Sequence, residues 1–144
     1  MVKIKFLIAL LLFFFLSGVS QLKAEQLSSN DKANIKTVVE QQLEAFAKDD
    51  FDKAYSYAAP LIKRIFSSPE IFKNMVVTQY QAVYRPKKID FGEATIIRGA
   101  PTLNVFLVDP DGNFVTATYL MQRQPDNSWL IAGCYLNTSN FDET

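Results

Sequence analysis

The groups that could carry out chemistry in this chain are limited by one absence, because the sequence contains no histidine. A Ser–His–Asp or Cys–His relay therefore cannot be built, and a zinc site with histidine ligands is excluded. The single cysteine, Cys134, cannot supply a thiolate cage for a metal. No glycine-rich loop of the kind that holds phosphate groups is present. We therefore expect no cofactor and no metal, and only carboxylate and phenol chemistry remains.

Tyrosines and acidic residues are the remaining candidates for chemistry. The phenols are those of Tyr55, Tyr57, Tyr80, Tyr84 and Tyr119. Asp90 and Glu93 are the acids nearest the start of the predicted sheet. A carboxylate base that faces a phenol in an apolar pocket stabilises an enolate, whereas the alternative is that the tyrosines only pack, with their hydroxyls in water. The pair Asp49-Asp50 lies at a helix end and is interpreted as serving helix geometry.

One cluster of residues indicates ligand binding instead of catalysis. Tyr80, Tyr84 and Arg85 lie where a helix is predicted to pass into a strand, and Tyr119 lies in a later strand. A guanidinium beside aromatic rings can hold a carboxylate with two hydrogen bonds. Alternatively, Arg85 stacks on a tyrosine or pairs with an internal acid and holds the junction between helix and sheet. We predict these four residues as ligand-binding, with no catalytic residue, and a small apolar or carboxylate-bearing molecule as the ligand.

The N-terminus has the layout of a secretory signal peptide. Lys3 and Lys5 precede a continuous apolar run over residues 6–16, and small polar residues follow. A helix of about 11 residues rises only about 17 Å, which is short of the roughly 30 Å hydrocarbon core of a membrane. We therefore predict a signal peptide over residues 1–24, cleaved after Ser20 or Ala24, followed by one domain over residues 25–144. The protein would be secreted or periplasmic; the alternative is a membrane anchor formed by uncleaved residues 4–19.

The charge of the mature chain excludes one class of partner. Lysine plus arginine and aspartate plus glutamate number 15 each. Removing the three lysines of the signal peptide leaves 12 basic residues against 15 acidic ones, a net charge of about −3. No basic surplus would draw the chain onto nucleic acid. A membrane is expected as a partner only through an uncleaved N-terminal segment.

The elements that must position these residues begin with three predicted helices. Each starts at a residue whose side chain can accept a hydrogen bond from the first turn, namely Ser28, Asp50 and Ser68. The first helix has an apolar face between Ile35 and Phe46. The second is limited by Pro60, and residues 61–66 form a short helical connector. The third must end before Arg85, because the proline that follows disfavours helical geometry there.

From Lys88 onward the hydrophobic period changes to two, which is typical of strands. Four strands are predicted, at residues 88–98, 103–108, 114–123 and 129–136. Residues 109–112 and 125–128 are turn sequences, and such short turns imply antiparallel hairpins. The sequence therefore predicts an α+β fold in which three N-terminal helices pack on a curved four-stranded antiparallel sheet.

The predicted sheet carries apolar residues on both faces. In the second strand, Phe106 and Val108 alternate with Leu103, Val105 and Leu107. Helices on one side only would leave the other face exposed, and large exposed apolar patches usually mark an interface. We therefore predict a homodimer through the sheet.

Three segments carry a resemblance to a known family. They are EQQLEAFAKDD (Glu40 to Asp50), VYRPKKIDFG (Val83 to Gly92) and MQRQPDNSWLIAGCYL (Met121 to Leu136). Together they resemble a bacterial family known only as domain of unknown function 4864. The order of elements and the closing SWLIAGC also resemble the cystatin-like α+β roll, the cone shared by SnoaL-like cyclases, ketosteroid isomerase and nuclear transport factor two. The resemblance implies the fold and brings no established activity or catalytic residues.

The leading prediction for function is thus a non-catalytic exported domain that binds a small apolar or amphipathic ligand or a partner protein. A metal-independent isomerase, dehydratase or cyclase that uses Tyr and Asp or Glu is the second possibility. A structural dimerisation module is the third. The polarity of the pocket discriminates between the first two, because an enzyme of this kind needs a carboxylate facing a phenol.

Overall fold

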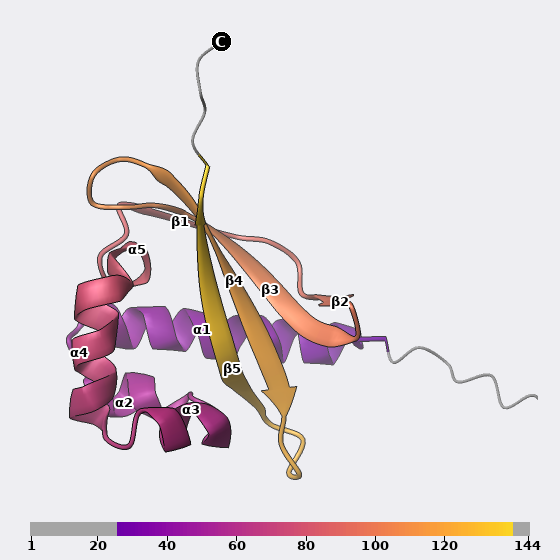
Figure 1. The fold of residues 1–144 in the computed structure, drawn as a ribbon. Coiled ribbons are helices and arrows are strands. Elements are labelled where there is room, and N and C mark those ends of the chain that lie inside the picture. Colours follow the sequence, from indigo (N-terminus) through magenta and orange to yellow (C-terminus); the bar gives the residue numbers. More distant parts are fainter. Residues whose placement is uncertain (1–25, 140–144) are drawn as a thin grey trace, which may run out of the picture.

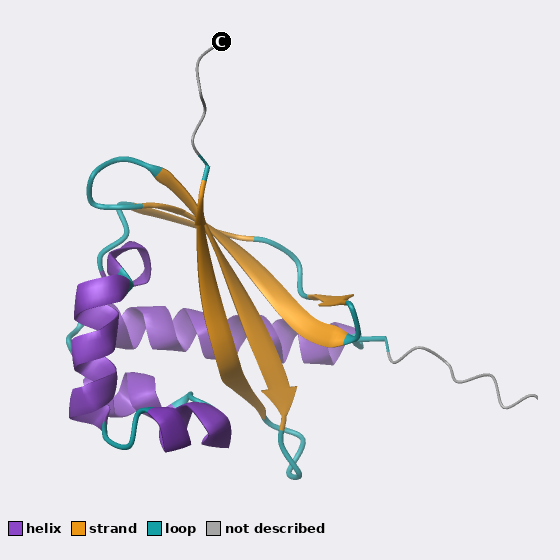
Figure 2. Cartoon of the chain, in the orientation of Figure 1, coloured by secondary structure: helices purple, strands orange, loops and turns teal. Residues whose placement is uncertain are grey.

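The computed structural model describes residues 26–139, so the expected signal peptide lies outside the described residues. An antiparallel sheet carries helices on one face only (Figures 1 and 2). The helices are α1 (Ser29–Ala47), α2 (Phe51–Ser56), α3 (Pro60–Ile65), α4 (Pro69–Gln79) and α5 (Gln81–Tyr84). The strands are β1 (Lys88–Phe91), β2 (Thr95–Ile97), β3 (Ala100–Val108), β4 (Phe114–Arg123) and β5 (Trp129–Thr138). The predicted α+β class and antiparallel pairing are confirmed.

Helix α1 is fixed at its N-terminus by a capping box. The Ser28 hydroxyl accepts the Asp31 N–H at 3.0 Å, and the Asp31 carboxylate accepts the Ser28 N–H at 3.1 Å. The same carboxylate pairs with Arg123 at 2.9 Å and lies 3.4 Å from the indole nitrogen of Trp129. One acidic side chain therefore both starts α1 and ties it to strands β4 and β5.

The later helices differ in number from the prediction. Asp50 and Ser68 cap α2 and α4 as predicted, by accepting a backbone N–H at 3.1 and 3.2 Å. The connector forms the short helix α3. The third predicted helix, however, is interrupted at Tyr80, whose φ of −127° leaves the helical region, so that it is two helices, α4 and α5. Among residues 26–139, no helix combines the length and the apolarity needed to cross a membrane.

The first predicted strand, residues 88–98, is two strands that both pair with the same edge of β3. Strand β1 pairs with the second half of β3, β2 pairs with its first residues, and the chain leaves the ladder between them. The break follows Gly92, whose N–H still donates to the Asn104 carbonyl at 2.9 Å, because the next pair is Thr95 with Thr102 and one residue more lies on this side than on β3. The alternation of apolar residues predicted one continuous strand because it does not reveal an extra residue in the pairing with another strand.

Strands β3, β4 and β5 form consecutive hairpins, and the order across the sheet is β1-β3-β4-β5, with β2 beside β1 on β3. The ladder between β4 and β5 shifts register, because Leu120 pairs with Gly133 whereas Met121 pairs with Ile131. Ala132 is therefore an extra residue on β5, which is a β-bulge. Strand β5 is an edge strand, and backbone hydrogen bonds of 2.8 Å join Ile131 to the segment between α2 and α3.

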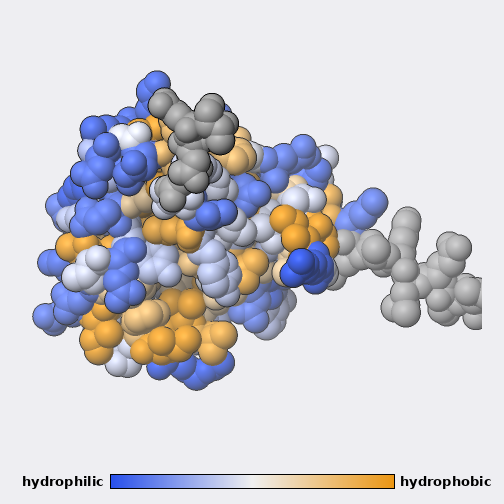
Figure 3. Space-filling model, turned by 45° about the horizontal axis from the view of Figure 1, so that its top comes forward, coloured by the Kyte–Doolittle hydropathy of each residue, from blue (hydrophilic) through white to orange (hydrophobic). Residues whose placement is uncertain are grey.

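The core lies between the sheet and the helices. The inward residues of β3, namely Leu103, Val105 and Leu107, are buried in this core. The outward face carries no helix in the described part of the chain (Figure 1). It exposes Phe106 and Tyr135, but its centre is polar, with Thr118 donating to the Asn104 side chain at 2.8 Å. In the view of Figure 3, apolar surface forms separate patches divided by hydrophilic residues.

Candidate functional site: an apolar cavity beside strand β5

A cavity of about 150 Å³ lies between the helices and strand β5. It is walled by apolar side chains and a few polar ones: Gln42, Phe46, Ala58, Ile62, Phe66, Phe72, Met75, Val76, Gln79, Tyr80, Val83, Tyr119, Ile131, Gly133 and Cys134. None of these side chains is an aspartate, glutamate, lysine or arginine. The site is therefore suited to uncharged molecules, because an isolated charge in such surroundings loses its hydration without gaining a partner.

The elements around the cavity explain why this space is not filled. Helices α2 and α4 and the end of α3 meet at an aromatic cluster in which the Phe72 ring lies 5.5 Å from Tyr55 and 6.4 Å from Phe66, centroid to centroid. The Tyr55 hydroxyl donates to the Phe66 carbonyl at 2.6 Å and fixes the end of α3. These contacts hold the helices as a frame beside the edge of the sheet. Half-buried Ile62, Phe66 and Met75 form the rim through which the cavity meets solvent.

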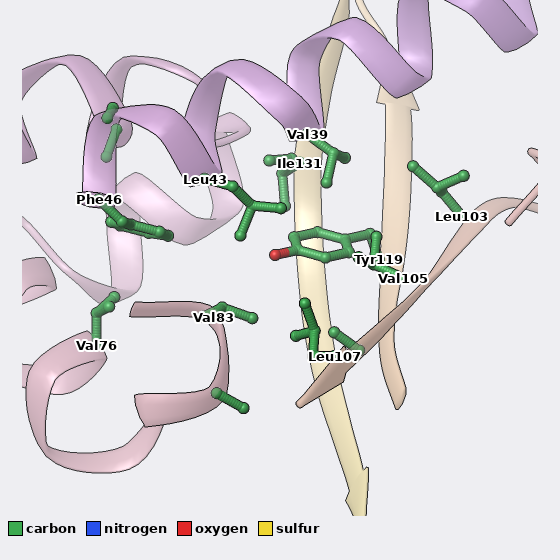
Figure 4. Packing of buried hydrophobic residues seen from close by; sticks show 14 of the residues in the cluster. Val39, Leu43, Phe46, Val76, Val83, Leu103, Val105, Leu107, Tyr119 and Ile131 are labelled. Atoms are coloured by element: carbon green, nitrogen blue, oxygen red, sulfur yellow. The ribbon is translucent and has the colours of Figure 1, made fainter. Parts of the chain in front are cut away.

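Tyr119 supplies the most unusual group in the cavity. Its side chain extends from β4 toward the helices, with the hydroxyl oxygen on the side where Phe46 and Val83 lie (Figure 4). The residue is 1 % exposed, and its hydroxyl makes no hydrogen bond in the described part of the chain. Buried polar groups in proteins are nearly always hydrogen-bonded. The hydroxyl of Tyr119 is therefore an exception to this rule among the described residues.

Cys134 lies beside this phenol because of the bulge in β5. Cys134 pairs with inward-facing Tyr119 across the ladder, although Ile131, three residues earlier, also faces the core. A regular strand would place residues an odd number apart on opposite faces, so the extra Ala132 brings both inward. Burial raises the pKa of the Cys134 thiol to about 12. A thiol is a weak hydrogen-bond partner, which leaves the neighbouring hydroxyl of Tyr119 essentially unsatisfied.

The protonation states of these two groups exclude base chemistry by either at neutral pH. Burial, followed by the neighbouring Cys134, raises the pKa of Tyr119 well above its ordinary value. Both the phenol and the thiol therefore carry their protons. In the described chain, no carboxylate lines the cavity to act as a base. The arrangement can donate a hydrogen bond from Tyr119 but cannot abstract a proton.

Two other polar side chains in the wall, those of Tyr80 and Gln42, are already engaged. The Tyr80 hydroxyl donates to the Cys134 carbonyl at 3.2 Å, and this bond joins the break between α4 and α5 to strand β5. The Gln42 amide donates to the Ala54 carbonyl at 3.1 Å and joins α1 to α2. These two groups hold the frame, whereas Gln79 is exposed at the outer end of α4.

The four residues predicted as ligand-binding separate into two places. Tyr80 and Tyr119 line the cavity, whereas Tyr84 and Arg85 lie in a partly exposed cluster around Asp49. The Tyr84 hydroxyl donates to the Asp49 carboxylate at 2.6 Å, and an Arg85 nitrogen reaches the same oxygen at 2.8 Å. These contacts, first the Tyr84 hydrogen bond and then that of Arg85, lower the pKa of Asp49.

Arg85 accordingly holds the junction between the helices. Its guanidinium donates to the Phe46 carbonyl at 2.8 Å, at the end of α1, and lies 3.9 Å from the centroid of the Tyr84 ring. This is the structural alternative left open by the sequence, with Asp49 as the internal acid. Asp49 itself has a φ of +55°, a left-handed conformation that an aspartate tolerates and that turns the chain from α1 into α2.

Sequence reasoning missed Cys134 as a wall residue and Asp49 as the partner of Arg85. The glycine at position 133 was the available signal for the first, because a glycine inside a strand often marks a bulge. Asp90 and Glu93, the acids nearest the sheet, are exposed, and Glu93 pairs with Lys32 outside the cavity. Within residues 26–139, no cluster of three or more acidic, cysteine or histidine side chains could hold a metal ion.

Comparison with known proteins places the chain in a family. Residues 28–144 match the family described as Domain of unknown function (DUF4864). The chain belongs to the DUF4864 family. The match covers the whole fold described above, including α1, the cavity and the Asp49 cluster, and it agrees with the resemblance carried by the three sequence segments. No curated protein and no solved structure matches the chain.

Proposed function

We propose that this DUF4864 protein binds a small uncharged apolar molecule in the cavity beside β5 without catalysing a reaction there. The observation that carries the proposal is the cavity itself, an apolar space of about 150 Å³ with one uncommitted hydroxyl. An apolar cavity of about this volume accommodates a molecule the size of a single six-membered ring. Ligand pockets typically combine apolar walls with a few placed polar groups.

The wall chemistry favours binding over the isomerase, dehydratase or cyclase alternative. Those reactions need a base within hydrogen-bond reach of the substrate, and the described lining contains no carboxylate. It also favours an uncharged ligand over a carboxylate-bearing one. The guanidinium of Arg85, the anchor that the sequence suggested for a carboxylate, is engaged with Asp49 and the end of α1.

The experiment is an NMR titration of the isotope-labelled protein with methylenecyclohexane, an apolar ring of suitable size. Saturable shifts confined to amides of the cavity wall are expected. In Met75→Trp, a larger side chain at the rim fills part of the entrance, and binding should weaken at least several-fold. Asn74→Trp places the same side chain at an exposed position of α4 outside the wall and should bind as the natural protein does. Absence of saturable binding, or equal binding by Met75→Trp, would overturn the proposal.

The uncovered face of the sheet supports a second proposal, a homodimer. Phe106 and Tyr135 are 49 % and 63 % exposed there, on β3 and β5, with no helix over them in the described chain. Because both protomers of a twofold interface present the same patch, one substitution introduces a charge on each side of the contact. Light scattering of the Phe106→Glu variant should show monomers, and Ile65→Glu, which changes an exposed residue of α3, should not. A monomeric natural protein at micromolar concentration would end this proposal.

Two further features belong to the proposal. The helices on one face of a curved sheet support the cone-shaped roll of SnoaL-like and cystatin-like proteins as the wider fold group. The apolar run after Lys3 and Lys5 supports export to the periplasm or the medium. N-terminal sequencing of the exported chain would test the second, with Gln21 or Glu25 expected as the first residue.

A further inference from the structure

The cavity contains one polar group that has a role only when a ligand is present. Of the polar side chains in its wall, Gln42 and Tyr80 donate to backbone carbonyls of the protein, and Gln79 is exposed at the outer end of α4. The hydroxyl of Tyr119 is fully buried and has no hydrogen-bond partner in the described chain. Its burial has already removed it from water, so the cost of its desolvation is present before any ligand arrives.

The direction of the missing hydrogen bond follows from the surroundings. The Tyr119 phenol is held in its protonated form, since burial raises its pKa well above the ordinary value. The neighbouring thiol of Cys134 is protonated as well and is only a weak acceptor. The carbonyl of Cys134 already accepts the hydroxyl of Tyr80. No described protein group therefore gives Tyr119 a good acceptor, and a ligand that carries one can supply it.

We propose that the cavity selects molecules of about one ring that carry a neutral hydrogen-bond acceptor, such as a ketone or aldehyde oxygen, and that Tyr119 donates to this oxygen. This inference rests on the proposed function and narrows it to a ligand class. The acceptor is neutral because no lysine or arginine lines the described cavity to balance an anion. Walls built from Phe46, Phe72, Val76 and Val83 contact the hydrocarbon part of the molecule.

A pair of matched probes distinguishes selection of a hydrogen-bond acceptor from binding of any small apolar molecule. Cyclohexanone and methylenecyclohexane have nearly the same size and shape, but only the ketone has an oxygen acceptor. The affinity of each probe is first corrected for its free energy of transfer from water to an apolar solvent. After this correction, the ketone should bind the natural protein about tenfold more tightly than the alkene. In Tyr119→Phe, which removes only the hydroxyl, this preference should disappear while the alkene still binds.

Tyr55→Phe is the matched control. It removes a half-buried tyrosine hydroxyl that already donates to the Phe66 carbonyl and does not line the cavity. This variant should keep the ketone preference of the natural protein. Circular dichroism and the dispersion of the amide spectrum check that all three proteins are folded.

Each outcome of the experiment has a distinct meaning. Loss of the ketone preference in Tyr119→Phe alone supports the assignment of Tyr119 as the donor. If the ketone and the alkene bind alike in the natural protein, or if Tyr119→Phe keeps the preference, the ligand class is wrong although the cavity binds apolar molecules. If neither probe binds the natural protein, the proposed function itself fails.

Discussion

Replacing Tyr119 with phenylalanine is expected to stabilise the ligand-free protein. Truncating a buried polar group normally removes a hydrogen bond and lowers the free energy of unfolding. Here the residue as a whole is 1 % exposed, and its hydroxyl has no hydrogen-bond partner in the described chain. Phenylalanine keeps the ring, which belongs to the same buried cluster as Leu43, Val105 and Leu107 (Figure 4), and removes only the unpaired oxygen.

The magnitude follows from the cost of an unsatisfied group. An unpaired buried hydroxyl costs about 1–3 kcal/mol, and the weak contact with the Cys134 thiol returns about 0.5 kcal/mol of this. The void left by one oxygen is small, so the cavity penalty is minor. We therefore expect Tyr119→Phe to raise the free energy of unfolding by about 1 kcal/mol, which corresponds to a rise in Tm of about 4 °C for a domain of this size.

The assay is urea unfolding at pH 7, with the slope of the transition required to stay unchanged so that only stability is compared. Tyr55→Phe and Tyr80→Phe are the controls. Their hydroxyls donate to backbone carbonyls at 2.6 and 3.2 Å. Each control should lose about 1 kcal/mol, because a carbonyl is left without its donor.

The reasoning would be refuted if Tyr119→Phe lost as much stability as Tyr55→Phe. Such a loss would mean that the hydroxyl of Tyr119 has a good partner in solution, for example a water held in the cavity. The assignment of this hydroxyl as an unused donor would then fail, and with it the ligand class.

Three further outcomes are expected. The hydrogen bond from Arg123 is the main cause that lowers the pKa of Asp31, so the ionised Asp31 stabilises the fold above about pH 4 and this stabilisation is lost as the pH falls. The free energy of unfolding, measured in urea between pH 2 and pH 6, should therefore depend less on pH in Asp31→Asn than in the natural protein. An equal pH dependence in the two proteins would contradict this. Burial raises the pKa of Cys134 from 9.0 to about 12, so the contribution of the protonated thiol to stability is complete below pH 9 and is lost as the pH rises toward 12. Between pH 8 and pH 10.5, Cys134→Ala should therefore lose less stability than the natural protein. An equal loss in the two proteins would show that the thiol is not buried. Arg85→Ala should lower the free energy of unfolding by about 1 kcal/mol, because a partly exposed charged donor at the end of α1 is removed. The affinity of this variant for cyclohexanone, measured by calorimetry, should stay unchanged. A tenfold loss of affinity would show that Arg85 holds the ligand.

Signals that act over a few residues could be predicted well. The hydroxyl of Ser28 followed by Asp31 predicts the start of α1, and both hydrogen bonds of the capping box are present. The turn at residues 109–112 and the strand over residues 114–123 also appear where the pattern placed them. Caps, turns and alternation depend on neighbouring residues alone, so a single sequence contains the information.

Features that depend on contacts between distant segments could not be predicted. The strand over residues 88–98 is divided because Gly92 bonds to Asn104 whereas Thr95 pairs with Thr102, which leaves one extra residue opposite β3. The third helix is divided at Tyr80, whose hydroxyl bonds to a carbonyl of β5, 54 residues later. Hydrophobic periodicity describes one element at a time and is blind to such contacts.

For the candidate site, the sequence by itself determined the available chemistry. A chain without histidine and with one cysteine is limited to phenols, carboxylates and basic groups wherever it folds. Only the tertiary structure decided which of these groups share a cavity. Tyr80 and Tyr119 meet beside Cys134 because a bulge turns β5, whereas Arg85 is drawn away to Asp49, 36 residues earlier. The physical reason is that burial and partnership are properties of the packed chain: the same phenol is an ordinary surface group or an unpaired donor according to what the other elements place around it.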